Sequence, residues 1–166
     1  MERAAVLLVT AVLLAGCGGS SKNTATTTTT AATPPPPGPG KVLYAGGPWA
    51  VVVRANTATA YHYVGRHWLA DRSGAVKIEI LGPQPGQRVA SIPQVAVQLT
   101  AKRPLIESGL WVDGKELYVK GGGLKPEQGT IYGAPDTKLA PGTHVAVGYG
   151  RTDTHGTAVA WTFRVP

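Results

Sequence analysis

Cysteine, methionine and phenylalanine are almost absent from this chain, which has one of each among its 166 residues. The only cysteine is Cys17, so the remainder of the chain has no disulfide and its stability must come from packing. Charged residues make up only 15% of the chain, and although the net charge is +7, no basic run is longer than Lys102-Arg103. A positive charge that is scattered in this way does not favour a nucleic-acid partner, and we expect none.

Motifs for catalysis are lacking as well. The chain contains no G-x-S-x-G, the motif that holds the nucleophile of α/β-hydrolases. Glu107 and Glu116 are poor candidates for a carboxylate pair, because Glu116 follows the turn residues Asp113-Gly114 and is expected in solvent. Residues 153–156 (Asp-Thr-His-Gly) have the composition of a tight turn between two strands. We therefore expect no enzyme activity and no cofactor.

The longest apolar run is short. Residues 4–14 follow Arg3 and make 11 mostly apolar positions, too few to span a bilayer and typical of a secretory signal peptide. The run leads into Leu14-Ala15-Gly16-Cys17, which resembles the lipobox of bacterial lipoproteins. This resemblance implies that residues 1–16 are a signal peptide and that Cys17 carries a diacylglyceryl group and acyl chains such as palmitate. Acyl chains of this kind anchor a protein stably, so we expect the protein on the extracytoplasmic side of the cell membrane.

Residues 17–40 are expected to form a disordered linker that starts at the lipidated cysteine. Residues 18–40 contain no large apolar side chain that could offset the entropy of ordering them. Their threonine run and Pro34–Pro37 are typical of an extended stalk. Fully extended, these 23 residues reach roughly 75 Å at about 3.3 Å each. The linker would therefore hold a folded domain well away from the membrane.

Alternating apolar residues predict β-strands from residue 76 onward, because side chains on one face of a strand recur at every second residue. The clearest runs are Val76 to Ile80, Val95 to Leu99, Val145 to Tyr149 and Val159 to Val165. A hairpin is expected at Asp113-Gly114, with a returning strand at 117–119 that ends at Gly121–Gly123. We see no helical period in this part of the chain.

The same alternation predicts which side chains face the core. In the last run Val159, Trp161, Phe163 and Val165 should point inward and Arg164 to solvent, since the opposite register would bury a charge. In the other runs the apolar members, among them Val145, Val147 and Tyr149, should point inward and their neighbours, such as His144, outward. Trp111 lies between Leu110 and Val112 and should be the more exposed of the two tryptophans.

Sheets that are covered on one face pack in pairs as a sandwich. Four segments resemble bacterial immunoglobulin-like domains: Ile80-Leu81-Gly82-Pro83, Gly114-Lys115-Glu116-Leu117, the run 139–145 and the run 161–165. The resemblance covers about residues 76–166 and implies an all-β, immunoglobulin-like sandwich. It implies little about function, since this architecture supports many unrelated roles.

Residues 41–75 are expected to add a short β-meander in front of the sandwich. Three strands are predicted, at 49–54, 58–64 and 66–69. Three strands do not make a domain by themselves. We therefore expect them to extend one sheet of the sandwich or to cap its end.

Four histidines suggest a second hypothesis, metal binding. His62 and His67 lie on adjacent predicted strands, and His144 and His155 flank the last hairpin, but no pair has a tight ligand spacing. Periplasmic copper-resistance proteins resemble this chain in the ending from residue 156 to residue 163, which makes a periplasmic copper-binding protein the alternative function. Those proteins use a histidine at the mature amino terminus, where this chain has Cys17. The simpler interpretation places the histidines on the surface of the strands.

Aromatic residues gather in the meander. Tyr61 and Tyr63 share one face of a predicted strand, and Trp68 lies on the next strand. Exposed, these rings would suit stacking on the sugars of a cell-wall glycan; buried, they would form the seam between residues 41–75 and the sandwich. Taken together, the sequence favours a membrane-tethered, non-catalytic binding or interaction module of the cell envelope. Besides the membrane, its expected partner is a cell-wall glycan or another envelope protein.

Overall fold

The computed structural model describes residues 39–166. The predicted signal peptide, Cys17 and all but the last two residues of the predicted linker lie outside these residues. All of the described residues belong to one compact unit. The described residues form β-strands, turns and loops, and they include no helix that is long and apolar enough to cross a membrane.

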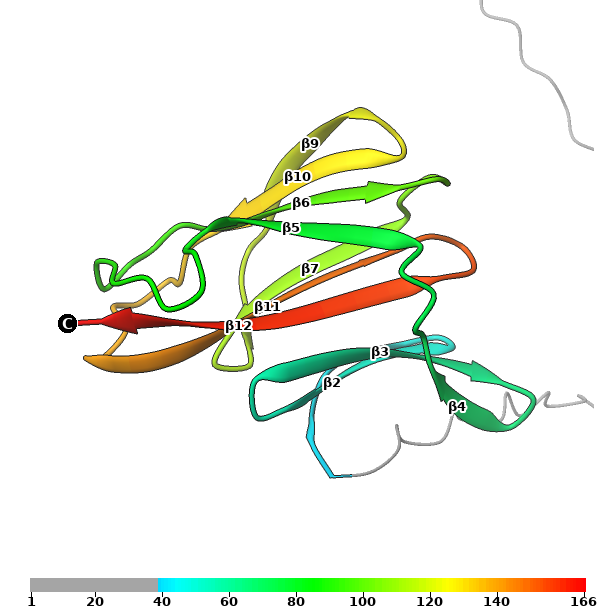
Figure 1. Cartoon of the computed structure of the whole chain (residues 1–166), viewed down its shortest axis with the longest axis horizontal. Helices are drawn as coiled ribbons and strands as arrows, with labels where there is room; N and C mark the ends of the chain where they lie inside the picture. Colours follow the sequence, from blue (N-terminus) through cyan, green and yellow to red (C-terminus); the bar gives the residue numbers. More distant parts are fainter. Residues whose placement is uncertain (1–38) are drawn as a thin grey trace, which may run out of the picture. The chain divides into compact units, whose positions relative to one another are not determined.

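The strands pair as three antiparallel sheets, which Figure 1 shows as three layers. The N-terminal sheet has the order β1-β2-β3-β4 and contains β1 (Lys41–Gly46), β2 (Trp49–Arg54), β3 (Thr57–Val64) and β4 (His67–Ala70). The β6 sheet has the order β5-β6-β10-β9 and contains β5 (Val76–Gly82), β6 (Val95–Ala101), β9 (Lys120–Lys125) and β10 (Gln128–Gly133). The β11 sheet has the order β12-β11-β7-β8 and contains β7 (Glu107–Val112), β8 (Lys115–Glu116), β11 (Gly142–Arg151) and β12 (Gly156–Val165).

The β6 and β11 sheets pack face to face. If β5 is taken as strand A, the two sheets read A-B-E-D and G-F-C-C′, which is the strand order of the immunoglobulin fold. The sandwich is immunoglobulin-like. This strand order confirms the fold class expected from the sequence.

The last strand faces the core as predicted. Trp161, Phe163 and Val165 are buried between the two sheets, together with Val95, Val97 and Leu99 of β6. The indole Nε1 of Trp161 donates a hydrogen bond of 2.8 Å to the carbonyl oxygen of Pro83, so the polar atom of this ring is also satisfied. Arg164 is exposed.

The N-terminal sheet differs from the expected extension or cap. It has four strands instead of three, because Lys41–Gly46 pairs with β2 along its length. It joins neither sheet of the sandwich edge to edge but packs against the outer face of the β11 sheet, with β3 lying near β12 (Figure 1). The β11 sheet is therefore covered on both faces.

Coverage of both faces overturns three of the predicted side-chain orientations. Val145, Val147 and Tyr149 of β11 face the N-terminal sheet, whereas Ala146 faces the core of the sandwich. Gly148 also lies on that core side, where an added Cβ would come within 3.3 Å of Val97. Trp111 does point away from the core of the sandwich, as the alternation required, yet it is buried, with 2% of its surface exposed.

The hairpin after β7 is shorter than expected. Its second strand consists of Lys115–Glu116 alone. The glycines at 121–123 do not end it but lie within β9. At Gly121 a Cβ atom would come within 2.3 Å of the carbonyl oxygen of Thr130, so only glycine lets β9 approach β10 this closely.

Replacement of either buried tryptophan by alanine should destabilise the protein strongly. Each variant loses the transfer energy of an indole and leaves a cavity, so we expect Trp111→Ala and Trp161→Ala to cost about 3–5 kcal/mol each. Leu69→Ala is a control, because Leu69 is 56% exposed, and should change stability by less than about 1 kcal/mol. Guanidinium denaturation of the mature chain measures all three. A Trp111 variant as stable as the control would mean that the N-terminal sheet does not seal the β11 sheet.

Candidate functional site

The three aromatic residues singled out in the sequence lie together on the N-terminal sheet. Tyr61 and Tyr63 are on β3, and Trp68 is on β4 directly opposite Tyr63. The centroids of the Tyr63 and Trp68 rings are 5.2 Å apart and the rings are tilted by 53°, a favourable geometry for an aromatic pair. All three residues are half-buried.

These rings do not form the seam with the sandwich. The buried seam consists of Val51 and Ala60 of the N-terminal sheet against Trp111, Val147 and Tyr149 of the β11 sheet. Since Ala60 faces the sandwich, its neighbour Tyr61 points the other way, and Tyr63 shares that face with Tyr61. The interpretation of the three rings as the seam is therefore wrong, and they lie on the face of the sheet that is turned away from the sandwich.

The seam has its own aromatic residues, which the sequence did not single out. Trp49 on β2 is 2% exposed and stacks on His62, with ring centroids 4.1 Å apart. The guanidinium carbon of Arg151 lies 5.6 Å from the centroid of the Trp49 ring. Tyr44 on β1 contacts Tyr149 with a centroid distance of 5.6 Å.

Of the four histidines of the metal hypothesis, the two on adjacent strands of the N-terminal sheet occupy different environments. His62 is half-buried against Trp49, whereas His67 is exposed at the start of β4. The register places both on the same face, diagonal to each other across the β3–β4 pair. Within residues 39–166, however, no three histidine, cysteine or carboxylate side chains gather as they would around a metal ion.

His144 is buried, contrary to the expected surface position. Its Nδ1 lies 2.7 Å from Oδ2 of Asp113, its Nε2 lies 2.8 Å from the carbonyl oxygen of Ala140, and its ring stacks on Phe163. Burial alone would lower the pKa of His144, but the hydrogen bonds to Asp113 and Ala140 outweigh it and hold the pKa above its ordinary value. The side chain therefore joins the β7–β8 turn to the loop before β11, and this role is structural.

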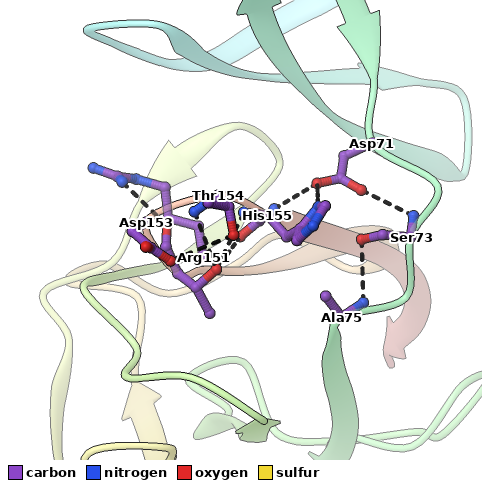
Figure 2. A network of polar contacts seen from close by, with 9 residues as sticks. Asp71, Ser73, Ala75, Arg151, Asp153, Thr154 and His155 are labelled. Carbon is purple, nitrogen blue, oxygen red and sulfur yellow. Dashed lines mark hydrogen bonds and ion pairs between the residues drawn. The ribbon is translucent and has the colours of Figure 1, made fainter.

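A second polar cluster joins the N-terminal sheet to the β11–β12 turn. Figure 2 shows Asp71, just after β4, pointing toward His155 in that turn. Oδ2 of Asp71 accepts hydrogen bonds from the backbone N–H of Gly156 at 2.8 Å and from Nδ1 of His155 at 3.2 Å. Oδ1 accepts a bond of 2.9 Å from the backbone N–H of Ser73. Burial would raise the pKa of Asp71, but the bonds from Ser73 and Gly156 outweigh it and hold the pKa below its ordinary value.

The rest of this turn has the conformation expected from its composition. Residues 152–155 connect β11 to β12, and the backbone N–H of Thr152 donates a hydrogen bond of 2.8 Å to the carbonyl oxygen of His155. The Thr152 hydroxyl accepts a bond of 3.1 Å from the backbone N–H of His155. Asp153 pairs with Arg103 at 2.9 Å, and both of these side chains are about 60% exposed. The predicted tight turn is therefore present, one residue earlier than expected, because Gly156 already belongs to β12.

A third polar cluster lies around Glu107, one of the two glutamates considered in the sequence. Glu107 accepts hydrogen bonds from the hydroxyl of Tyr44 and from Nε of Arg151, so both of its oxygens are occupied. Burial, together with the carboxylate of Glu107, raises the pKa of Tyr44 to about 12. Glu116 is exposed and pairs across the hairpin with Trp111, near the other end of β7. The two glutamates therefore form no carboxylate pair.

Comparisons with known proteins add no family. No family model and no curated protein matches the chain. Among solved structures, the endo-β-1,4-mannanase of Thermotoga petrophila is similar over 55% of this chain and 20% of its own, at 12% identity and a TM-score of 0.46. The selenomethionine form of PcoC, a copper resistance protein of Escherichia coli, is similar over 53% of this chain and 99% of its own, at 24% identity and a TM-score of 0.34.

The titin immunoglobulin tandem domains A164-A165 are similar over 67% of this chain and 62% of their own, at 7% identity and a TM-score of 0.37. All three TM-scores lie below 0.5. The assignment of the fold rests on the strand order and the two packed sheets described above.

Replacement of Asp71 tests whether the polar cluster around this residue holds the N-terminal sheet to the β11–β12 turn. Asp71→Ala leaves the backbone N–H of Gly156 without its acceptor, so we expect a loss of about 1–3 kcal/mol in the free energy of unfolding. Asp153→Ala is the matched control: it also removes an aspartate near the same turn, but from an exposed ion pair worth less than about 1 kcal/mol. Urea denaturation at neutral pH compares the two. Equal losses would show that Asp71 is no more than a surface charge.

Proposed function

We propose that this chain is a lipid-anchored, non-catalytic binding module of the bacterial cell envelope. The anchor is carried by the lipobox-like Leu14-Ala15-Gly16-Cys17, and the linker up to residue 40 gives the folded part its reach. The first strand begins at Lys41, immediately after this linker. The order of signal, anchor, linker and fold suits a protein that contacts the envelope beyond the membrane surface.

The outward face of the N-terminal sheet is its proposed binding surface. The observation that carries this proposal is the position of Tyr61, Tyr63 and Trp68, which are half-buried rings that belong to neither buried cluster of the fold. The opposite face of the same sheet is sealed against the sandwich, so these rings have a rigid support. Flat rings on a fixed support are suited to the apolar faces of sugar rings, and we take a cell-wall glycan as the ligand.

The anchor is tested by acyl labelling of cells that express the full chain. Cys17→Ser should abolish incorporation of radioactive palmitate and leave a precursor that is not cleaved after Gly16, because only the thiol of Cys17 can carry the thioether. Ser20→Ala, three residues further on, should be labelled like the wild type. Undiminished labelling of the Cys17→Ser variant would refute the lipoprotein assignment.

The binding surface is tested by sedimentation of the mature chain with purified cell-wall sacculi. We expect the double variant Tyr63→Ala, Trp68→Ala to bind at least about tenfold more weakly, since it removes the stacked pair and its contact area. Leu69→Ala is the matched control, because Leu69 is an exposed apolar neighbour on the opposite face of β4. Thermal melts of each variant establish that the fold is retained. Undiminished binding by a folded double variant would exclude this face as the site.

A further inference from the structure

A second group of exposed apolar side chains surrounds a hollow of about 350 Å³ on the sandwich. Three of its lining residues are large and apolar: Tyr118 is 77% exposed, Ile92 is 47% exposed and Tyr132 is 38% exposed. Ile92 lies in the loop before β6, Tyr118 in the connection from β8 to β9, and Tyr132 on β10. The loops that precede β6 and follow β10 lie at the end of the sandwich where β12 ends (Figure 1).

The exposure of the tyrosines is fixed by their neighbours. Tyr118 lies between Leu117, which is buried in the core of the sandwich, and Val119, which packs against that core. Leu117 is held further by a hydrogen bond of 2.9 Å from its backbone N–H to the carbonyl oxygen of Leu110. Since neighbouring side chains in an extended chain point to opposite sides, the ring of Tyr118 is directed outward. It cannot turn inward without pulling Leu117 from the core.

Tyr132 is fixed in the same way by the register of β10. Ile131 before it is 8% exposed and belongs to the core of the sandwich, so Tyr132 points to the outer face of the β6 sheet. There it pairs with Ala96 on one side and with Lys120 on the other. The small side chain of Ala96 leaves one side of the ring uncovered by its cross-strand neighbour.

Two contacts hold the frame of the hollow together. The backbone N–H of Leu139 donates a hydrogen bond of 2.8 Å to the carbonyl oxygen of Ser91, which ties the loop after β10 to the loop before β6. At Gly133 an added Cβ would lie 2.9 Å from the carbonyl oxygen of Tyr118, so this glycine lets the β8–β9 connection lie directly on the end of β10. A frame of this kind costs little ordering entropy when a ligand binds.

The polar lining defines the class of ligand. Gln94, Lys120 and Asp136 also line the hollow. Together they offer hydrogen-bond donors and acceptors, and their single positive and single negative charge balance. An anionic ligand would meet the carboxylate of Asp136, and a purely apolar one would remove all three polar groups from water without replacement. A neutral ligand with both apolar faces and hydroxyl groups satisfies the rings and the polar side chains together.

We propose that the hollow formed by Ile92, Tyr118 and Tyr132 binds a short neutral oligosaccharide, with its sugar rings against the tyrosines and its hydroxyls on Gln94, Lys120 and Asp136. This site is separate from the face that carries Tyr61, Tyr63 and Trp68, because it is formed by the β6 sheet and its loops rather than by the N-terminal sheet. The proposal adds a second binding site to the proposed function and specifies its ligand as a short neutral oligosaccharide. It does not depend on which partner the outward face of the N-terminal sheet binds.

The test is a titration of the mature acylated chain with cellotetraose and with chitotetraose, followed by saturation-transfer NMR. Lauryldimethylamine oxide is a suitable detergent, since it contains no sugar that would compete. We expect saturation transfer from the protein to the pyranose C–H protons of at least one of the two probes. We also expect Tyr118→Ala and Tyr132→Ala each to raise the Kd of the protein for that probe at least about tenfold. The melting temperature of the Tyr118→Ala variant should shift by less than about 3 °C, because its ring is exposed.

Two control variants make the result specific. Leu81→Ala removes a side chain of β5 that is 45% exposed and does not line the hollow, and it should leave the Kd unchanged. Tyr63→Ala should also leave it unchanged; a loss of binding in that variant alone would place the oligosaccharide on the N-terminal sheet, which supports the proposed function and overturns this second site. Absence of binding by both probes, or unchanged binding in folded Tyr118→Ala and Tyr132→Ala variants, would likewise overturn it.

Discussion

The aromatic seam between the N-terminal sheet and the β11 sheet is the contact on which the rest of the structure depends. Trp49 and Val51 on one side, and Trp111 and Tyr149 on the other, are each at most 2% exposed. Large rings bury about 150–250 Å² each, and at about 25 cal/mol per Å² each ring contributes several kcal/mol. Without this contact, the N-terminal sheet would be a meander without a core, and the sandwich would expose an indole and a phenol ring.

Apolar packing alone does not fix how one sheet sits on another, because it is not directional. Here the polar clusters supply the direction. The Asp71 carboxylate holds the end of β4 to Gly156, and Glu107 of β7 holds Tyr44 of β1. Because these two contacts bind the N-terminal sheet to the β11 sheet at separate places, the N-terminal sheet cannot rotate on the β11 sheet or shift along it by one residue. The same constraint determines that Tyr61 and Tyr63 face outward.

Sequence alternation predicted well which side chains share one face of a strand, but it did not predict what covers each face. Trp161 and Phe163 were assigned correctly because the charge of Arg164 marks the other face of β12 as polar. Trp111 was placed on the correct side, but its burial depends on a sheet that is more than 40 residues earlier in the chain, and no local pattern reports that contact. For β11 the assignment failed because valine and tyrosine on the outer face are as apolar as a core, whereas Gly148 on the inner face gives no apolar signal.

The polar contacts follow the same division between local and long-range information. The spacing of Asp71 and Ser73 is typical of a local side-chain bond to the backbone, and the structure contains that bond. The partners that give Asp71 its role, His155 and Gly156, lie 84 and 85 residues further on, so sequence spacing gives no signal for them. The rings of Tyr118 and Tyr132 were missed for a related reason, since separate loops bring them to one hollow only in the folded sandwich.

Under the proposed function, the arrangement of the aromatic residues favours weak and repeated binding over one tight site. The most buried rings seal the layers, and the rings left at the surface are half-buried or exposed, on strands or on a connection between strands. Surface sites of this kind bind small ligands weakly, because each ring contributes only a modest contact area. Under the proposed function, however, a lipid anchor and a linker would confine the module close to its ligand, at effective concentrations on the order of millimolar. Tethering can then supply what a shallow site lacks, and two separate sugar-binding surfaces on one rigid frame would strengthen attachment to a polymer that presents many copies of the same unit.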